Sequence, residues 1–267
     1  MLDVEQTLFA TFAQDGLYHI QCSGLVPGPG HVYCTLIVGE EKALLIDSGF
    51  GDDVFFPYLS TLTDKPILAA ATHVHPDHTA GAGAFPELWI DKGDEPMLKR
   101  VHGEQAYDED RHLLFGATKV RFLERGQVFD LGGRTVTSVY TPGHTWGSTC
   151  YYDSRTKLML TGDTMNQRVF LQCAVPTIPL SRYRQSLCDV LKYDFDRFLG
   201  GHHPQPIPRA HFGTMLQMID AFSPEKAVPN IRPGMEGIRK YVSGRGYGDP
   251  GYCGFMYRES ELAAFWR

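Results

Sequence analysis

Short apolar runs alternate with polar and glycine-rich segments along most of the chain. Runs rich in β-branched and aromatic residues predict strands over 18–22, 33–38, 43–47, 67–72, 120–123, 135–140, 149–153 and 157–160. Apolar positions at helical spacing predict helices over 95–101, 109–115, 183–192 and 212–222. No internal repeat or low-complexity linker divides the sequence. The pattern therefore predicts a mixed α/β chain in which two strand-rich halves share one site.

The segment 72–78 carries four strong metal-binding side chains within six residues: His73, His75, Asp77 and His78. An apolar run precedes it and small residues follow it, which predicts a strand end, a loop and a helix start. A loop can turn all four side chains toward one point, whereas alternate residues of a strand face opposite ways. Histidine nitrogens and a carboxylate oxygen suit zinc, and also iron or manganese.

Three further candidate ligands each follow a predicted strand and adjoin a glycine. They are His144, Asp163 and His202. In α/β folds, ligands collect at such strand ends. Histidines without this context more often lie on the surface or in a satisfied core. We interpret four of them in that way: His19, His102, His112 and His211.

These motifs together resemble those of the metallo-β-lactamase superfamily. The resemblance runs from the segment 44–49 to His202 in the expected order, and includes a hairpin-like segment over 123–133. It implies an α/β (α+β) fold, a four-layered αββα sandwich with the metal site at the edge between the two β-sheets. We expect a single domain over 1–267, with a C-terminal extension at about 234–267 that the resemblance does not explain.

The resemblance also implies a role for each candidate ligand. Three histidines would bind the first metal ion: His73, His75 and His144. Three residues would bind the second: Asp77, His78 and His202. Asp163 would bridge both ions, and Asp47 would support the ligand loop by hydrogen bonds rather than bind metal. The implied cofactors are two divalent metal ions, with zinc favoured over iron or manganese.

The same resemblance implies hydrolysis by a hydroxide held between the two metals, because zinc-bound water can reach a pKa of roughly 7. Asp77 would also accept the proton released at attack. Asp163 counts against β-lactam hydrolysis, since true β-lactamases of the superfamily generally lack a bridging aspartate there. His75 counts against flavodiiron proteins, which carry glutamate at that position.

Three functional classes remain open. We favour a dinuclear hydrolase of an ester, thioester, lactone or phosphodiester bond in a small substrate. The alternative is a mononuclear iron persulfide dioxygenase, which retains much of the same ligand pattern. The third class is a non-catalytic metal-binding protein.

Residues beyond the ligands are less diagnostic. Four in the connection after Asp163 are candidates to hold an anionic substrate group, although solvent exposure or pairing with a nearby acid is the favoured alternative for each: Arg168, Arg182, Tyr183 and Arg184. Cys173 lies in the same connection, where packing is the favoured interpretation. Four tail tyrosines could line a pocket, pack the tail or form a dimer contact: Tyr241, Tyr247, Tyr252 and Tyr257.

The histidine pair at 202–203 requires a choice between neighbours. His202 directly follows glycine, as the family pattern requires, so we predict that it is the ligand. His203 precedes Pro204, which favours extended backbone. Neighbouring side chains in an extended segment point apart. We therefore predict that His203 lies in the pocket wall or supports a ligand.

Charge and composition indicate which partners and which cellular location to expect. The net charge of −6 over 267 residues gives no support for nucleic-acid binding. No apolar stretch is long enough to span a membrane, and the first residues lack a basic segment followed by an apolar core. The six cysteines include no Cys-x-x-Cys pair. We expect a cytoplasmic protein with reduced thiols and a small-molecule substrate, with a homodimer as one option for its oligomeric state.

Overall fold

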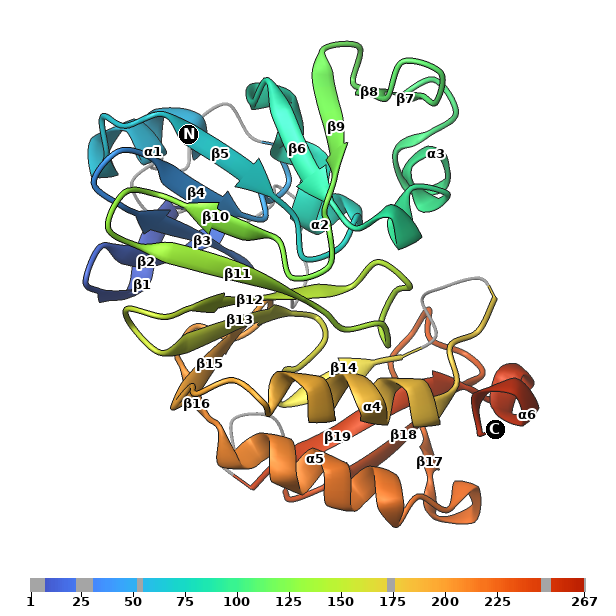
Figure 1. The fold of residues 1–267 in the computed structure, drawn as a ribbon. Helices are drawn as coiled ribbons and strands as arrows, with labels where there is room; N and C mark the ends of the chain where they lie inside the picture. Colours follow the sequence, from blue (N-terminus) through green and yellow to red (C-terminus); the bar gives the residue numbers. More distant parts are fainter. Residues whose placement is uncertain (1–7, 23–30, 52–54, 172–175, 246–250, 267) are drawn as a thin grey trace, which may run out of the picture.

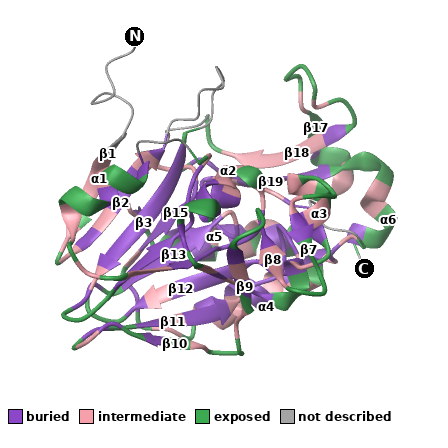
Figure 2. Ribbon diagram, turned by 90° about the horizontal axis from the view of Figure 1, so that it is seen from above, coloured by how far each residue is buried: buried purple, intermediate pink, exposed green. Residues whose placement is uncertain are grey.

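Two large β-sheets face each other, and helices cover their outer faces (Figure 1). The computed structural model describes residues 8–22, 31–51, 55–171, 176–245 and 251–266. Figure 2 shows most strands of both sheets as buried, with exposed residues at turns and on helices. This arrangement confirms the expected αββα sandwich. Among the described residues, no helix has the length and apolar character needed to span a bilayer.

The first sheet has nine strands. Its N-terminal strands pair antiparallel, whereas β4, β5, β6 and β9 run parallel. In spatial order the strands are β1 (Leu8–Gln14), β2 (Leu17–Cys22), β3 (Val32–Val38), β4 (Ala43–Ile46), β5 (Ile67–Ala70), β6 (Glu87–Ile90), β9 (Thr118–Phe122), β8 (Leu113–Leu114) and β7 (Tyr107–Asp108).

The second sheet has six strands. In order they are β10 (Val128–Asp130), β11 (Thr135–Tyr140), β12 (Thr149–Asp153), β13 (Leu158–Gly162), β15 (Arg197–Gly200) and β16 (Ile207–Pro208). β13 and β15 are parallel, so their carboxyl ends reach the same edge.

The inner faces of the two sheets form one apolar core. Leu44 and Ile46 of β4 belong to the same buried cluster as Leu158 and Leu160 of β13. Burying each such side chain contributes about 1.5–3 kcal/mol. The hydroxyl of Tyr151 crosses between the sheets and donates a 2.8 Å hydrogen bond to the carbonyl of Ala71. That bond ties β12 to the segment that enters the first ligand motif.

Short helices cover the outer face of the first sheet: α1 (Phe55–Leu62), α2 (Pro76–Thr79) and α3 (Met97–His102). Two 3₁₀ turns, η2 (Ala80–Ala84) and η3 (Lys92–Asp94), lie between them in the chain. Phe55 and Leu59 of α1 pack in a core with Leu36 and Leu45 of the sheet. This side of the sandwich therefore has its own hydrophobic cluster, separate from the inner core.

The outer face of the second sheet packs against α4 (Leu180–Val190), α5 (Ala210–Asp220) and a third sheet. The third sheet has the order β14 (Arg168–Phe170), β19 (Cys253–Arg258), β18 (Ile238–Ser243) and β17 (Val228–Pro229). The remaining short elements are η4 (Pro224–Lys226), η5 (Glu259–Glu261) and α6 (Leu262–Phe265). Phe255 and Phe265 share a buried cluster with Phe212 of α5. The described part of the C-terminal extension therefore packs into the core beneath the second sheet.

Most predicted elements are found with shifted ends, but the helix predicted over 109–115 is wrong. That segment forms parts of the β7–β8 hairpin. His112 and Phe115 have φ angles of 49° and 52°. This left-handed backbone cannot continue a right-handed helix. Strands β1, β6, β14 and β16–β19 and helices α1 and α6 were not predicted.

Candidate metal centre

The candidate ligands converge because the elements that precede them end at one edge of the sandwich (Figure 1). The 73–78 motif follows β5 and enters α2. His144 lies in the turn between β11 and β12. Asp163 follows β13, and His202 follows β15 after one further residue. Parallel pairing brings the carboxyl ends of β13 and β15 together, while the 73–78 motif reaches the same edge from the first sheet.

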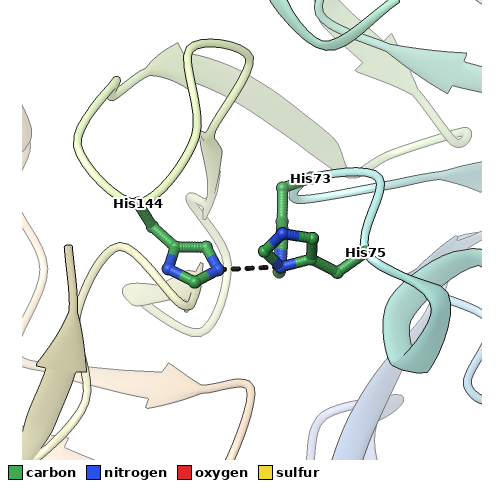
Figure 3. Close-up of side chains that lie close together, drawn as sticks. All are labelled: His73, His75 and His144. Carbon is green, nitrogen blue, oxygen red and sulfur yellow. Dashed lines mark hydrogen bonds between the residues drawn. The ribbon is translucent and has the colours of Figure 1, made fainter. Parts of the chain in front are cut away.

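Three histidine side chains form a tight group. The Nε2 atom of His73 lies 2.9 Å from Nδ1 of His75, and Nε2 of His144 lies 3.0 Å from the same atom. Figure 3 shows the rings turned toward one another, with His144 on one loop and the other two on the loop before α2. One ring nitrogen from each residue therefore points to a common centre.

A second group lies beside the first. The Oδ2 atom of Asp77 is 3.7 Å from Nε2 of His78 and 3.6 Å from Nε2 of His202. Asp163 stands between the groups, with Oδ2 at 3.6 Å from Nε2 of His144 and 3.2 Å from Nε2 of His202. The structure thus brings all seven predicted ligand side chains together in overlapping candidate ligand groups.

Outward hydrogen bonds fix which ring nitrogen faces the centre. The Nδ1 atom of His78 lies 2.8 Å from Oδ2 of Asp47. The Nδ1 atoms of His144 and His202 lie 2.5 Å and 2.9 Å from the backbone carbonyls of Phe170 and His31. A carbonyl or carboxylate oxygen accepts only from a protonated nitrogen. The Nε2 atoms are therefore left to face inward, which is the usual arrangement of metal-binding histidines.

One buried ring nitrogen is positioned to bind a metal ion. The Nε2 atom of His78 is buried and has no hydrogen-bond partner among the described residues. Buried polar atoms are normally satisfied, so an orphan of this kind calls for a missing partner. His78 belongs to two candidate ligand groups, one with His73 and Asp163 and one with Asp77 and His202. Imidazole nitrogens and carboxylate oxygens together fit zinc, iron or manganese.

The electrostatics separate the two groups. Burial and the neighbouring histidines lower the pKa of His73 well below its usual range and that of His75 to about 2. Burial also opposes charging of His78 and His202, but nearby carboxylates outweigh it and raise both pKa values to about 9. The same histidines hold the pKa of Asp163 well below its usual range against the effect of burial. His73 and His75 are therefore neutral, and His78 and His202 hold protons that a cation would displace.

Asp47 lies where its predicted supporting role requires. Its carboxylate accepts a 2.7 Å hydrogen bond from the backbone N–H of Thr72 and a 2.9 Å bond from the Thr72 hydroxyl, besides its contact with His78. Asp47 has a φ of 63°, a left-handed conformation that aspartate tolerates better than most residues. Gly162 meets Thr72 from the other sheet: its φ is 48°, and a Cβ there would lie 2.3 Å from the Thr72 hydroxyl oxygen. The ligand loop is thus fixed from both sides.

Asp94 supports the centre in a way that the sequence analysis missed. Its buried carboxylate accepts hydrogen bonds from the backbone N–H of Val74 at 3.2 Å, from the hydroxyl of Thr145 at 2.8 Å and from the backbone N–H of Gly147 at 2.7 Å. Burial raises the pKa of Asp94 to about 6 despite these donors. The residue joins the two loops that carry the three-histidine group. Its position just after β6, at the same sheet edge, was the available signal.

The adjacent histidines at 202 and 203 point apart. His202 faces Asp163 and Asp77, whereas Nδ1 of His203 lies 2.7 Å from the backbone carbonyl of Gln205. The carbonyl of His203 lies 3.0 Å from Nε2 of the buried His19. Among the described residues that line the cavity at the centre, His202 is present and His203 is not.

A cavity of about 860 Å³ opens beside the ligands, with His75, His144, Asp163 and His202 in its wall. Of the four candidate substrate-binding residues, only Arg168 belongs to the described lining.

The other three candidates are engaged elsewhere. Tyr183 is buried and donates a 2.8 Å hydrogen bond to the Thr164 carbonyl. Arg184 pairs with Asp220 of α5 at 2.6 Å, and Arg182 lies 3.9 Å from Asp189 within α4. The core-facing side of α4 thus takes Tyr183, while its other faces carry the two arginines. Cys173 and Tyr247 lie outside the described residues.

The part of the chain that carries these ligands is similar to a known protein family. Residues 27–202 match the sequence profile described as the Metallo-beta-lactamase superfamily. The chain belongs to this superfamily. The matched segment ends at His202 and therefore contains every candidate ligand. The β17–β19 segment of the third sheet lies beyond it.

Several curated superfamily relatives are named as thioesterases. Over 155 residues, 49% of this chain and 56% of the relative, the sequence is 30% identical to "Acyl-coenzyme A thioesterase MBLAC2" of Gallus gallus. Over 136 residues, 49% of this chain and 39% of the relative, it is 30% identical to "Atrochrysone carboxyl ACP thioesterase" of Aspergillus chevalieri. The chain thus matches little more than half the length of the first relative and less than half that of the second.

Solved structures show the same superfamily fold. A metallo-beta-lactamase from Pontibacter korlensis has a TM-score of 0.62 at 15% identity, covering 80% of this chain and 100% of that chain. The superfamily protein ST1585 from Sulfolobus tokodaii has a TM-score of 0.57 at 22% identity, covering 83% and 92%. At these identities the likeness shows the fold alone.

Proposed function

We propose that this chain is a metal-dependent hydrolase that cleaves acyl thioesters. The observation that carries the proposal is the convergence of seven nitrogen and oxygen ligand side chains beside one cavity. The thioester class is supported by relatives named as acyl-coenzyme A and acyl carrier protein thioesterases.

We infer a dinuclear centre. The first ion would be held by His73, His75 and His144. The second would be held by Asp77, His78 and His202, with Asp163 shared between them. Zinc is favoured, with iron or manganese as alternatives. When bound, such ions lower the pKa of water to roughly 7 and polarise a carbonyl oxygen.

The chain itself supplies the proton acceptor. Hydrolysis adds a water oxygen to the thioester carbonyl carbon and breaks the carbon–sulfur bond. The proton lost from water ends on the sulfur of the departing thiol. Asp77 is placed to carry it, because Oδ2 lies at the centre, 3.6 Å from Nε2 of His202, while the side chain remains 29% exposed. A partly exposed carboxylate exchanges protons more readily than the more enclosed Asp163.

The cavity wall suits an acyl group. Val169, Phe170 and Met256 line it near the ligands, as does Tyr33 from β3. Phe170 also accepts the hydrogen bond from His144 through its carbonyl. The same short strand therefore orients a ligand and contributes apolar surface on which an acyl chain can pack.

The direct test combines metal analysis with a substrate panel. Protein made with ample zinc should contain about two equivalents and release thiol from acyl-coenzyme A or acyl N-acetylcysteamine thioesters, with slower hydrolysis of matched oxygen esters, lactones and phosphodiesters. One equivalent of iron, with oxygen consumption on glutathione persulfide, would support the dioxygenase alternative instead. Full metal occupancy without turnover of any of these substrates would favour a binding protein.

A further inference from the structure

Two arginines from separate elements face the cavity that holds the candidate ligands. Arg168 lies on β14, five residues after Asp163, and is half-buried. Arg232 lies in the connection between β17 and β18 and is exposed. Both line the same cavity as His75, His144 and His202. The third sheet carries both arginines to this cavity, because β14 pairs with β19, which pairs with β18.

Neither guanidinium is neutralised by the described part of the chain. Among the described residues, no carboxylate lies within 4.0 Å of Arg168 or Arg232. Other arginines have such partners: Arg134 pairs with Asp153 at 2.6 Å, and Arg184 with Asp220 at 2.6 Å. An arginine in a cavity wall without a carboxylate partner is a binding group for an anion, since its donors remain available, and the partial burial of Arg168 also strengthens its electrostatic field.

The side chain of Arg168 is held in position by a contact that does not neutralise its charge. Its Nη1 atom donates a 3.4 Å hydrogen bond to the hydroxyl of Tyr252, which is buried beside β19. A neutral hydroxyl leaves the full positive charge of the guanidinium in place. The remaining donors of the planar guanidinium can form a bidentate contact with a carboxylate or phosphate.

We propose that Arg168 and Arg232 form an anion-recognition pair, so that the substrate carries a carboxylate or phosphate in the part that occupies this cavity. This inference rests on the proposed thioester hydrolase and narrows its substrate class. The anion has two sources in a thioester: a carboxylate at the far end of the acyl group, or a phosphate on the thiol side. In either case the pair fixes the distance from the anion to the scissile carbonyl.

Binding to the zinc-loaded protein distinguishes the two sources. Calorimetric titration compares 4′-phosphopantetheine with pantetheine, and adipate with hexanoate, because each pair differs by one anionic group. The wild-type protein should bind the more anionic member of one pair at least about ten-fold more tightly, as expected for a charge-assisted contact. The pair that shows this preference identifies the source.

Variants assign that preference to the two arginines. Arg168→Gln and Arg232→Gln should each reduce the ratio of the two affinities to less than about three-fold. Arg232 is exposed, so its variant is expected to fold even if Arg168→Gln does not. The matched control is Arg155→Gln, which removes the same charge from the exposed turn at the opposite end of β12 and β13. Its ratio should equal that of the wild type.

Failure of this inference and failure of the proposed function give different results. If the anion pair is wrong, wild-type protein will show no preference within either pair of probes, or both variants will retain the preference. If only the thioesterase proposal is wrong, uncharged acyl N-acetylcysteamine thioesters will not be hydrolysed, while the binding preference and its loss in the variants remain.

Discussion

The carboxylate of Asp94 accepts a 2.7 Å hydrogen bond from the backbone N–H of Gly147, and a Cβ atom at Gly147 would lie 2.5 Å from Asp94 Cγ. The loop that carries His144 is thus held against a buried carboxylate at a distance that only glycine permits. Val74, between two ligands of the first motif, donates to the same carboxylate. Asp94 therefore sets the spacing of the three-histidine group without touching the centre.

Replacing Asp94 with asparagine should loosen the first metal ion. The amide NH₂ would face N–H and O–H donors, and a buried donor without an acceptor costs about 1–3 kcal/mol. We expect zinc affinity to fall about ten- to a hundred-fold, as for other partners that orient ligands, in a competition titration with a chelator. The control is Asp108→Asn, an exposed residue at the end of β7. Equal zinc affinity in both variants would show that Asp94 has no such role.

The neighbours His202 and His203 should differ in metal occupancy. His202→Ala removes a side chain directed at Asp77 and Asp163, so elemental analysis should show zinc falling from two equivalents toward one. His203→Ala removes a ring that contacts Gln205 instead, and its occupancy should stay near two. If His203→Ala lost zinc and His202→Ala retained it, His203 would be the metal ligand and His202 would not.

Asp163→Ala should weaken both metal ions together. The carboxylate lies within 3.2–3.8 Å of Nε2 atoms from both groups. We expect thioester hydrolysis to fall at least about a hundred-fold, with a wild-type circular dichroism spectrum showing that the sandwich persists. Turnover close to that of the wild type would mean that Asp163 is not shared between the ions.

Zinc uptake by the second group should depend on pH. The metal-free protein holds protons on His78 and His202, whose pKa values are raised to about 9. Protons therefore compete with zinc below about pH 9, and affinity should rise with pH until it levels off there. Competition titrations between pH 7 and pH 10 would measure the slope. A zinc affinity that does not rise between pH 7 and pH 9 would contradict the assignment.

His19 should make the fold sensitive to acid. Burial lowers its pKa from 6.5 to about 4. Below pH 6.5 the unfolded chain binds this proton more readily than the folded one, so the contribution is complete above pH 6.5 and is lost as the pH falls toward 4. The loss is at most about 3 kcal/mol.

Urea unfolding of metal-free protein at pH 7.5 and pH 4.5 would measure this loss. The fall in unfolding free energy between the two values should be smaller in His19→Gln than in the wild type. The contributions of the other residues are common to both proteins and cancel in the difference. His112→Gln, at a half-exposed hairpin position, serves as the control and should behave as the wild type.

The sequence predicted the ligand edge well because strand, turn and ligand are encoded in contiguous residues there. The run 67–71, the motif at 73–78 and the glycine beside His144 are each local signals. Asp94 was missed because its role depends on Val74 and Gly147, which reach it only in the folded chain. Arg232 was missed for a similar reason, since its place in the cavity wall with Arg168 depends on the pairing of the third sheet's strands.

The wrong helix at 109–115 has a different cause. Its apolar spacing suits either a helix or a short hairpin, and periodicity cannot decide between them over so few residues. Tyr183 was misjudged because a phenol near the ligands is as suitable for packing as for binding. In the fold it lies beneath the His144 turn, where a Cβ at Gly143 would be 2.3 Å from its ring.

Because β14 pairs with β19, the candidate ligands and the strand beside the cavity come from two separate stretches of sequence. All candidate ligands lie within 27–202, the stretch that matches the superfamily, whereas β19, the strand beside β14 in the third sheet, comes from 253–258. Substitutions in the later stretch can reshape the cavity without changing any ligand. New substrate preferences can therefore be engineered by substitutions in β17–β19 that leave every candidate ligand in place.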